Sequence, residues 1–391
     1  MYNRILNKLC KITGNIFISK ILSDFIIFIW DIIFFIRYFM VFNSEKLKKI
    51  DCNINNCRKK FQVSNKIIRK EFSELDLSII IPAYNSENTI EECIKSIIQQ
   101  KINYTYEVIV INDGSTDSTL DKIKKILEEN VFKNMVVISQ QNGGISVARN
   151  KGLEVSRGRY IMFCDSDDLL TRDSINKLLE KTKISEFDII EGNYYNSYIN
   201  KKVVGKPLWK NSFEVNLSSN KEFIYKIKGF PWGRIYNRKL WMDVEFPIGF
   251  DYEDTVIKYT IFRKASTFLY INEFIYEYRI NSDSITNKLK GQIKSLDTYY
   301  IIPYLIDLNY KLGIKFDSVF YKIILNQLGS LLYYRTNGVE DKFVDMILLE
   351  AKNLLLELED YCPKLNIKDK LLKDAIISEN KQRWILCCKN R

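Results

Sequence analysis

The sequence predicts an α/β fold with a mostly parallel sheet flanked by helices, and three features support this prediction. Between residues 77 and 183, short apolar segments alternate with stretches whose apolar residues recur at helical spacing. Polar turns rich in Asn, Asp, Gly and Ser join these segments. Strands separated by helices of this length form parallel sheets with right-handed crossovers. The composition, 46% hydrophobic and 27% charged over 391 residues, is typical of a globular chain with one or two domains.

The alternation comprises four strands and four helices. The first predicted helix illustrates the spacing, because Ile90, Cys93, Ile94 and Ile97 fall on one face. The predicted strands span 77–82, 106–111, 135–139 and 160–164, and the helices 89–100, 118–130, 146–155 and 171–183. Beyond residue 188 we expect a strand or loop excursion at 194–219, helices at 237–242 and 255–263, and an amphipathic helical region at 290–391.

The net charge of +11 is concentrated at the N-terminus. Residues 1–70 contain 14 Lys/Arg and 4 Asp/Glu, whereas residues 71–391 contain 45 and 44. A neutral body argues against a nucleic-acid groove, and the basic segment favours an anionic membrane surface. The apolar run at 16–42 is interrupted by Lys20, Asp24, Asp31 and Arg37, which disfavours a membrane span. It predicts an amphipathic helix lying in the membrane interface, or alternatively packed on the protein's own surface.

The cysteines favour a reducing compartment. The chain has eight, without a CxxC pair, and Cys93 and Cys164 fall in apolar patterns typical of core thiols. Together with the basic N-terminal segment, this predicts a location on the cytoplasmic face of a membrane, peripheral or monotopic.

Three aspartates directly follow the strand at 160–164. They are Asp165, Asp167 and Asp168. One of them would suffice to cap the following helix, which is the alternative interpretation. Three such carboxylates repel one another unless a cation is present, and oxygen ligands of this kind suit Mg²⁺ or Mn²⁺. The cluster therefore predicts a metal-dependent ligand site.

The other strand-to-helix turns are expected to meet at the same edge of the sheet. Each is polar: PAYNS at 82–86, NDGSTD at 112–117 and QNGG at 141–144. Open α/β sheets bind ligands at the carboxyl edge of their strands. Simple turn chemistry explains any one of these segments, but together they predict a polar crevice of nucleotide size.

Three segments in this order carry a resemblance to a known family: SIIIPAYNSENTIEECIKSIIQQ, EVIVINDGSTDST and QNGGISVARNKGLEVSRGRYIMFCDSDD. The region 78–188 resembles the family 2 glycosyltransferases of the GT-A fold, a Rossmann-like sheet. The resemblance implies a metal-dependent, inverting transfer of a sugar from a UDP-sugar to an acceptor hydroxyl. It also suggests a bacterial setting, with a glycan or lipid-linked acceptor in surface-polysaccharide synthesis.

The resemblance also implies roles for residues in the donor half of the site. Asp113 would accept a hydrogen bond from uracil, and Asp165 and Asp167 match the ends of the DxD motif, with Asp167 the more direct metal ligand. The nucleotide-sugar contacts would come from Pro82, Ala83, Tyr84, Asn85, Asp113, Asn142, Gly143, Arg149, Asp165 and Ser166.

The acceptor half is expected to contain the catalytic base. The chain has no His, so this task falls mainly to other titratable side chains. The resemblance points to the acidic pair at 253–254 and favours Asp254, with Asp251 and Glu253 as fallbacks and helix capping as the alternative. Glu253, Trp232 and Arg279 are further acceptor-side candidates. Trp232 would stack on an acceptor sugar or serve as a core aromatic, and Arg279, in a tyrosine-arginine segment, would reach the donor phosphate or pair with an acid such as Asp283.

The predicted organisation has three parts. Residues 1–70 form a membrane-associating segment, 71–289 the catalytic domain, with a nucleotide-sugar half at 77–190 and an acceptor half at 191–289, and 290–391 a helical region that packs on the domain or on a partner in a homo-oligomer. Two other functions are alternatives. One is a non-catalytic nucleotide-sugar-binding or scaffold protein of a glycan assembly complex, and the other a sugar nucleotidyltransferase, for which the Gly-rich loop after the first strand is missing.

Overall fold

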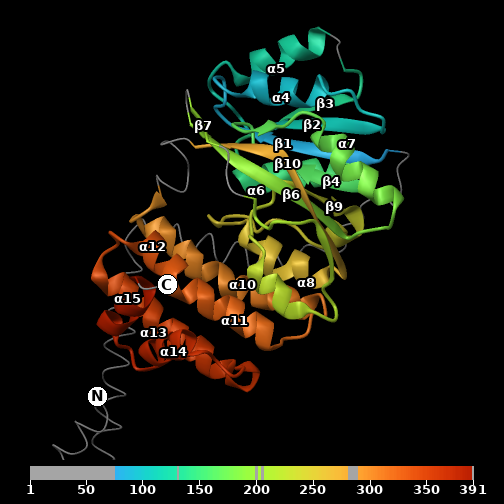
Figure 1. Ribbon diagram of the computed structural model, residues 1–391. Coiled ribbons are helices and arrows are strands. Elements are labelled where there is room, and N and C mark those ends of the chain that lie inside the picture. Colours follow the sequence, from blue (N-terminus) through green and yellow to red (C-terminus); the bar gives the residue numbers. More distant parts are fainter. Residues whose placement is uncertain (1–74, 130–131, 199–200, 204–206, 281–288, 390–391) are drawn as a thin grey trace, which may run out of the picture. The chain divides into compact units, whose positions relative to one another are not determined.

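The computed structural model describes residues 75–391 except 130–131, 199–200, 204–206, 281–288 and 390–391 (Figure 1). The chain divides into two units, Met1–Asn65 and Lys66–Arg391, and the described elements belong to the second. The predicted segment 1–70, with its amphipathic helix, lies outside the described residues. Among the helices that are described, none is both long and apolar enough to cross a membrane.

The first four strands form the parallel half of the sheet. They are β1 (Leu77–Ala83), β2 (Tyr106–Asn112), β3 (Met135–Ser139) and β4 (Tyr160–Phe163), arranged in the order β3-β2-β1-β4 with every pair parallel. Strands buried on both faces read as continuous apolar runs, and β1 and β2 are buried along their whole length. The predicted parallel sheet is confirmed.

Helices cover both faces of this half (Figure 1). They are α4 (Ile90–Ile98), α5 (Thr119–Glu128) and α6 (Ile145–Val155). Ile79 and Ile81 of β1 belong to the same core as the apolar face of α4, whereas Ile80 points to α6. A Cβ on Gly152 of α6 would lie 2.3 Å from Cγ2 of Ile80, so glycine permits the close packing of α6 on β1.

The second half of the sheet differs more from the prediction. The full strand order is β3-β2-β1-β4-β9-β6-β10-β5. The added strands are β6 (Ile189–Tyr198), β9 (Arg234–Asn237), β10 (Thr267–Arg279) and β5 (Leu169–Leu170). Two short strands pair outside this order, β7 (Lys201–Val203) with β6 and β8 (Phe213–Asn216) with β10. The excursion expected at 194–219 contains the end of β6 together with β7 and β8. The prediction of a helix at 237–242 was wrong, because the chain leaves β9 and forms only a 3₁₀ turn at Arg238–Trp241.

Two other predicted helices are shorter or less regular than expected. The helix expected at 171–183 is α7 (Ser174–Leu179) followed by a 3₁₀ turn at Glu180–Lys183, because Asp173 adopts a left-handed φ of 59°. The helix expected at 255–263 is a π-helical turn at Ile257–Ile261 that continues into α8 (Phe262–Lys264).

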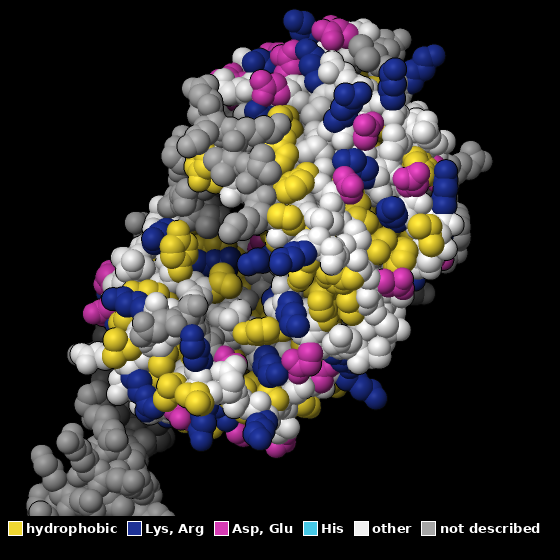
Figure 2. Space-filling model, viewed as in Figure 1, with side chains coloured by type: hydrophobic (Ala, Val, Ile, Leu, Met, Phe, Trp, Pro, Cys, Tyr) yellow, Lys and Arg dark blue, Asp and Glu magenta, His cyan; other side chains and the backbone are white. Residues whose placement is uncertain are grey.

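The C-terminal region is helical, as predicted. It contains α10 (Asp297–Lys311), α11 (Ser318–Asn326), α12 (Leu332–Thr336), α13 (Asp341–Glu357), α14 (Ile367–Ile377) and α15 (Lys381–Lys389), with a π-helical turn at Gln327–Leu331 between α11 and α12. Amide Nδ2 of Asn309 in α10 donates a hydrogen bond to the Tyr259 carbonyl, so α10 packs beside the π-helical turn at Ile257–Ile261. Positive and negative side chains are interspersed over the visible face (Figure 2), consistent with the near-neutral sum of residues 71–391.

Candidate active site

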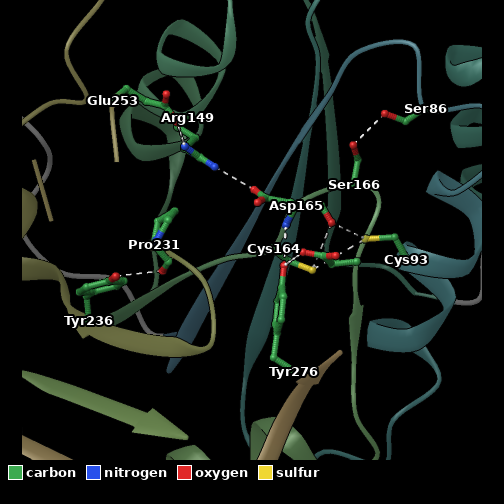
Figure 3. A network of polar contacts seen from close by, with 11 residues as sticks. Ser86, Cys93, Arg149, Cys164, Asp165, Ser166, Pro231, Tyr236, Glu253 and Tyr276 are labelled. Atoms are coloured by element: carbon green, nitrogen blue, oxygen red, sulfur yellow. Dashed lines mark hydrogen bonds and ion pairs between the residues drawn. The ribbon is translucent and has the colours of Figure 1, made fainter. Parts of the chain in front are cut away.

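The turns that follow β1, β2 and β4 meet at the carboxyl edge of the sheet. Asn85, which has a left-handed φ of 47°, donates its backbone N–H to Ser115 Oγ at 3.1 Å and accepts from the Thr116 N–H at 2.9 Å. The hydroxyls of Ser86 and Ser166 lie 2.7 Å apart (Figure 3). Side-chain hydrogen bonds therefore connect turns that the sequence separates by about 30 and 80 positions.

Asp113 holds the turn that follows β3. Its buried carboxylate accepts hydrogen bonds from Nε2 of Gln140 at 2.7 Å and from the backbone N–H groups of Gly143 and Gly144 at 2.9 and 2.8 Å. The candidates Asn142 and Gly143 thus lie in a loop that Asp113 anchors. That Asp113 accepts a hydrogen bond from uracil stays a prediction. Its carboxylate can accept a further hydrogen bond beyond these three.

Arg149 of α6 connects the two acidic clusters. Its guanidinium donates to Oδ1 of Asp165 at 2.8 Å and to Oε1 of Glu253 at 2.5 Å, and Figure 3 shows it pointing between these two residues. The side chain is 2% exposed and lies over the ring of Phe246. A buried charge of this kind needs its partners, so the turn after β4 and the loop at 250–254 are held together.

The three aspartates after β4 have different surroundings. Asp168 is buried, and its carboxylate accepts hydrogen bonds from the Tyr276 hydroxyl and the Arg279 backbone N–H, both at 2.8 Å. Burial and the neighbouring Asp167 and Asp165 raise its pKa well above the ordinary value. Asp168 is therefore part of the structural connection to β10 rather than an open ligand.

Asp165 and Asp167 are the carboxylates that remain partly exposed. Burial, and then the charge of Asp165, raise the pKa of Asp167 to about 6, and the positive charge of Arg279 offsets these effects only in part. Within the described part of the chain, no three His, Cys, Asp or Glu side chains form a complete metal site. Mg²⁺ commonly binds one or two carboxylates and completes its shell with water and phosphate oxygens, so this pair fits such an ion.

Glu253 and Asp254 follow a strained residue, because Tyr252 has a φ of 63°. Burial raises the pKa of Glu253 to about 7 despite the opposing charge of Arg149. Burial also raises the pKa of Asp254, opposed by the positive charges of Arg335 and Arg149. Glu253 is committed to an ion pair with Arg149, whereas Asp254 forms no ion pair within 4.0 Å among the residues described.

Comparison with known proteins decides which family this arrangement belongs to. Residues 78–243 match the family model described as Glycosyl transferase family 2. The chain contains a family 2 glycosyltransferase domain. Glycosyltransferase GlyA of Streptococcus pneumoniae is 31% identical over 220 residues, and the match covers 54% of this chain and 31% of GlyA. Poly(ribitol-phosphate) beta-glucosyltransferase of Bacillus spizizenii is 34% identical over 139 residues, which cover 35% of this chain and 21% of that protein. The chain therefore spans about a third of GlyA and less of the second relative.

A solved structure shares the fold of the family 2 domain and of the helices that follow it. The crystal structure of S. aureus TarS 1-349 in complex with UDP-GlcNAc superposes with a TM-score of 0.64 at 21% identity, and the match covers 81% of this chain and 91% of that one. This likeness confirms the predicted GT-A fold.

The two remaining acceptor-side candidates, Trp232 and Arg279, have different surroundings. Trp232 is 7% exposed and stacks between Phe230 and Tyr276, at centroid distances of 3.9 and 4.6 Å. This placement corresponds to the core-aromatic alternative. Arg279 pairs with Glu92 at 2.5 Å, and its Nε and Nη2 are buried without a hydrogen-bond partner among the described residues. Asp283, the pairing partner considered for Arg279, lies outside the described residues.

Two residues beside the acidic clusters had no role predicted from the sequence. The Tyr276 hydroxyl donates to Asp168 and accepts from the Asp165 N–H at 3.1 Å, so it supports the turn after β4 from β10. Arg335 of α12 lies over the ring of Tyr252, with 3.6 Å from its Cζ to the ring centroid. Tyr276 belongs to a recognised tyrosine-arginine segment, but no motif surrounds Arg335, and only the folded chain brings it to residue 252.

Proposed function

We propose that the protein is an inverting glycosyltransferase that moves a sugar from a UDP-sugar to an acceptor hydroxyl. The observation that carries this proposal is the ion-pair bridge through Arg149, which holds the DxD-type turn of the family 2 domain and the acidic loop at 250–254 at one site. The shared fold with a protein crystallised with UDP-GlcNAc supports a UDP-sugar as the donor.

The donor half of the proposed site lies along the turns after β1, β2 and β4. Pro82, Ala83, Tyr84 and Asn85 border the base and ribose, and Tyr84, 50% exposed, offers a ring for stacking. Asp165 and Asp167 would hold Mn²⁺ or Mg²⁺, which would neutralise the charge that develops on the departing diphosphate. The Arg279 guanidinium lies close enough to Asp167 to lower its pKa, and its two unpartnered nitrogens, Nε and Nη2, carry N–H groups that suit a phosphate oxygen.

The acceptor half depends on Asp254. The acceptor oxygen bonds to the anomeric carbon as the bond to the UDP oxygen breaks, and the hydroxyl proton passes to the Asp254 carboxylate. A raised pKa brings this base closer to the working pH, which favours proton abstraction. Glu253, neutralised by Arg149, serves to orient the loop.

We further propose that the acceptor belongs to a surface polysaccharide or a lipid-linked glycan and is modified at the cytoplasmic face of the membrane. The name of the Bacillus spizizenii relative, poly(ribitol-phosphate) beta-glucosyltransferase, supports a polymer as the acceptor. The basic charge of residues 1–70 supports attraction to anionic lipid.

The test is UDP release from a panel of UDP-sugars with Mn²⁺, with and without candidate acceptors. We expect turnover with at least one donor, loss of turnover with a chelator, and loss with Asp167→Asn. Metal-dependent UDP binding without turnover across a broad panel would favour the scaffold alternative. Turnover that persists in Asp167→Asn would overturn the role assigned to this aspartate.

A further inference from the structure

The C-terminal helices contribute one charged side chain to the surroundings of Asp254. Arg335, near the end of α12, lies face to face with Tyr252, at 3.6 Å from its Cζ to the ring centroid. This distance is well inside the range of cation–π contacts. Tyr252 is buried, and its φ of 63° is a conformation that residues with side chains rarely adopt. A strained residue persists only where its surroundings hold it in place.

Arg335 is itself fixed from two directions. Its Nη1 donates to Oγ1 of Thr298 at 2.5 Å, and its carbonyl accepts from the Gly291 N–H at 3.1 Å. Gly291 has a φ of 75°, and a Cβ there would lie 2.8 Å from the Asn337 carbonyl oxygen. The segment at 291–298 and α12 are therefore closely joined, and the guanidinium position is determined by both.

The same segment holds the start of the acidic loop. The Asp251 N–H donates to Oδ2 of Asp297 at 2.9 Å, and Lys294 donates to the Gly249 carbonyl at 2.9 Å. The acidic loop thus has contacts with the C-terminal region just before the strained residue and, through Arg335, at that residue itself. Among the described charges around Asp254, Arg335 and Arg149 favour its ionised form, and Asp165 opposes it.

We propose that Arg335 is a positioning residue for the catalytic base: it holds Tyr252 in its left-handed conformation and places a positive charge beside the Asp254 carboxylate. This inference rests on the proposed function, because it assumes that Asp254 acts as the base. It gives the C-terminal helical region a part in the reaction that its sequence does not reveal.

The experiment compares Arg335→Lys, which keeps the charge, with Arg335→Gln, which is polar but neutral. Arg383, exposed on α15, provides the matched control as Arg383→Gln. We expect kcat for UDP release to fall about tenfold or more in Arg335→Gln, less in Arg335→Lys, and not at all in the control. The KM for the donor should stay within about twofold in all three, because the donor contacts lie on other loops.

Equal losses in Arg335→Lys and Arg335→Gln, or full activity in Arg335→Gln, would overturn the inference. Full activity in Arg335→Gln combined with an inactive Asp254→Asn would overturn it while leaving the proposed function intact, whereas a wild type without turnover on any donor would overturn both. A crystal structure of Arg335→Gln gives a readout independent of turnover. We expect φ of Tyr252 to relax to a negative value, and an unchanged loop would contradict the positioning role.

Discussion

At the scale of single residues, neighbouring carboxylates acquire different tasks from their contacts. Asp168 is occupied by the Tyr276 hydroxyl and the Arg279 N–H, whereas the charge of Asp167 is only partly compensated by Arg279 and its pKa is raised to about 6. Glu253 and Asp254 differ in a similar way. Glu253 is bound to Arg149, whereas Asp254 forms no ion pair within 4.0 Å among the residues described. Burial raises the pKa of all four, so the contacts decide which one is available for a ligand or a proton.

A partly buried carboxylate on another element allows a test of how burial affects stability. Burial raises the pKa of Glu350 on α13 from 4.5 to about 7. The folded state therefore keeps a proton that the unfolded chain releases, so the stability this group contributes is present below the unfolded pKa and is lost as pH rises through about 7. We expect Glu350→Gln to raise Tm relative to wild type more at about pH 8 than at about pH 5. A difference in Tm that is the same at both pH values, measured by calorimetry, would contradict this account.

At the scale of elements, adjacent strands β6 and β9 share a buried ion pair. Glu191 and Arg234 are register partners with an N–O distance of 3.0 Å, and both are 0% exposed. The Arg234 guanidinium also lies between the rings of Phe230 and Phe262. Burial raises the pKa of Glu191 to about 7 despite the arginine, so the pair offsets only part of the desolvation cost.

Removal of one partner should destabilise the sheet more than removal of both. We expect Arg234→Met to lower the free energy of unfolding by ~3–5 kcal/mol, because it leaves Glu191 buried without its counter-charge. The double variant Glu191→Leu with Arg234→Met should recover most of this loss, because apolar side chains need no partner. Denaturant unfolding measures both values, and a double variant no more stable than Arg234→Met would count against the explanation.

Sequence patterns predict some of the helices and strands well and others poorly. From residue 77 to 163 every strand and helix was predicted to within a few residues, because each strand is a continuous apolar run and each helix has an apolar face. β9 is four residues long, and β10 has polar residues such as Asn272 and Glu273 in its interior. Their strand structure comes from pairing with distant strands, which local propensity does not encode.

At the scale of the whole molecule, the sequence predicted which turns converge but not what joins them. The ordered motifs led us to expect Asp113 and Asp165 at one edge of the sheet, and the acidic pair at 253–254 led us to expect the base at Asp254. The bridge through Arg149 spans 104 positions to Glu253, and Arg335 comes from a region without recognised chemistry. Contacts of this kind depend on the folded arrangement of distant segments, so they became visible only in the structure.

The charge asymmetry of the chain gives a prediction at the same scale. A variant that begins at residue 66, the start of the second unit, should still transfer sugar to a soluble acceptor but should no longer sediment with vesicles containing anionic lipid. The reason is that residues 1–65, which the variant lacks, contain 11 Lys/Arg and 4 Asp/Glu, so most of the net charge of +11 is removed. Neutral vesicles are the control, and undiminished sedimentation of the shortened variant with anionic vesicles would contradict the predicted membrane role.

The central claim, that Asp254 removes the acceptor proton, is tested most directly by UDP release from Asp254→Asn beside Asp251→Asn, a matched change in the same loop. We predict that Asp254→Asn slows turnover by about 100-fold or more while UDP affinity, measured by calorimetry, stays within about twofold of wild type. Asp251→Asn should keep most of the activity, because its loop contact with Asp297 is made by the backbone N–H. Undiminished turnover in Asp254→Asn would contradict the account.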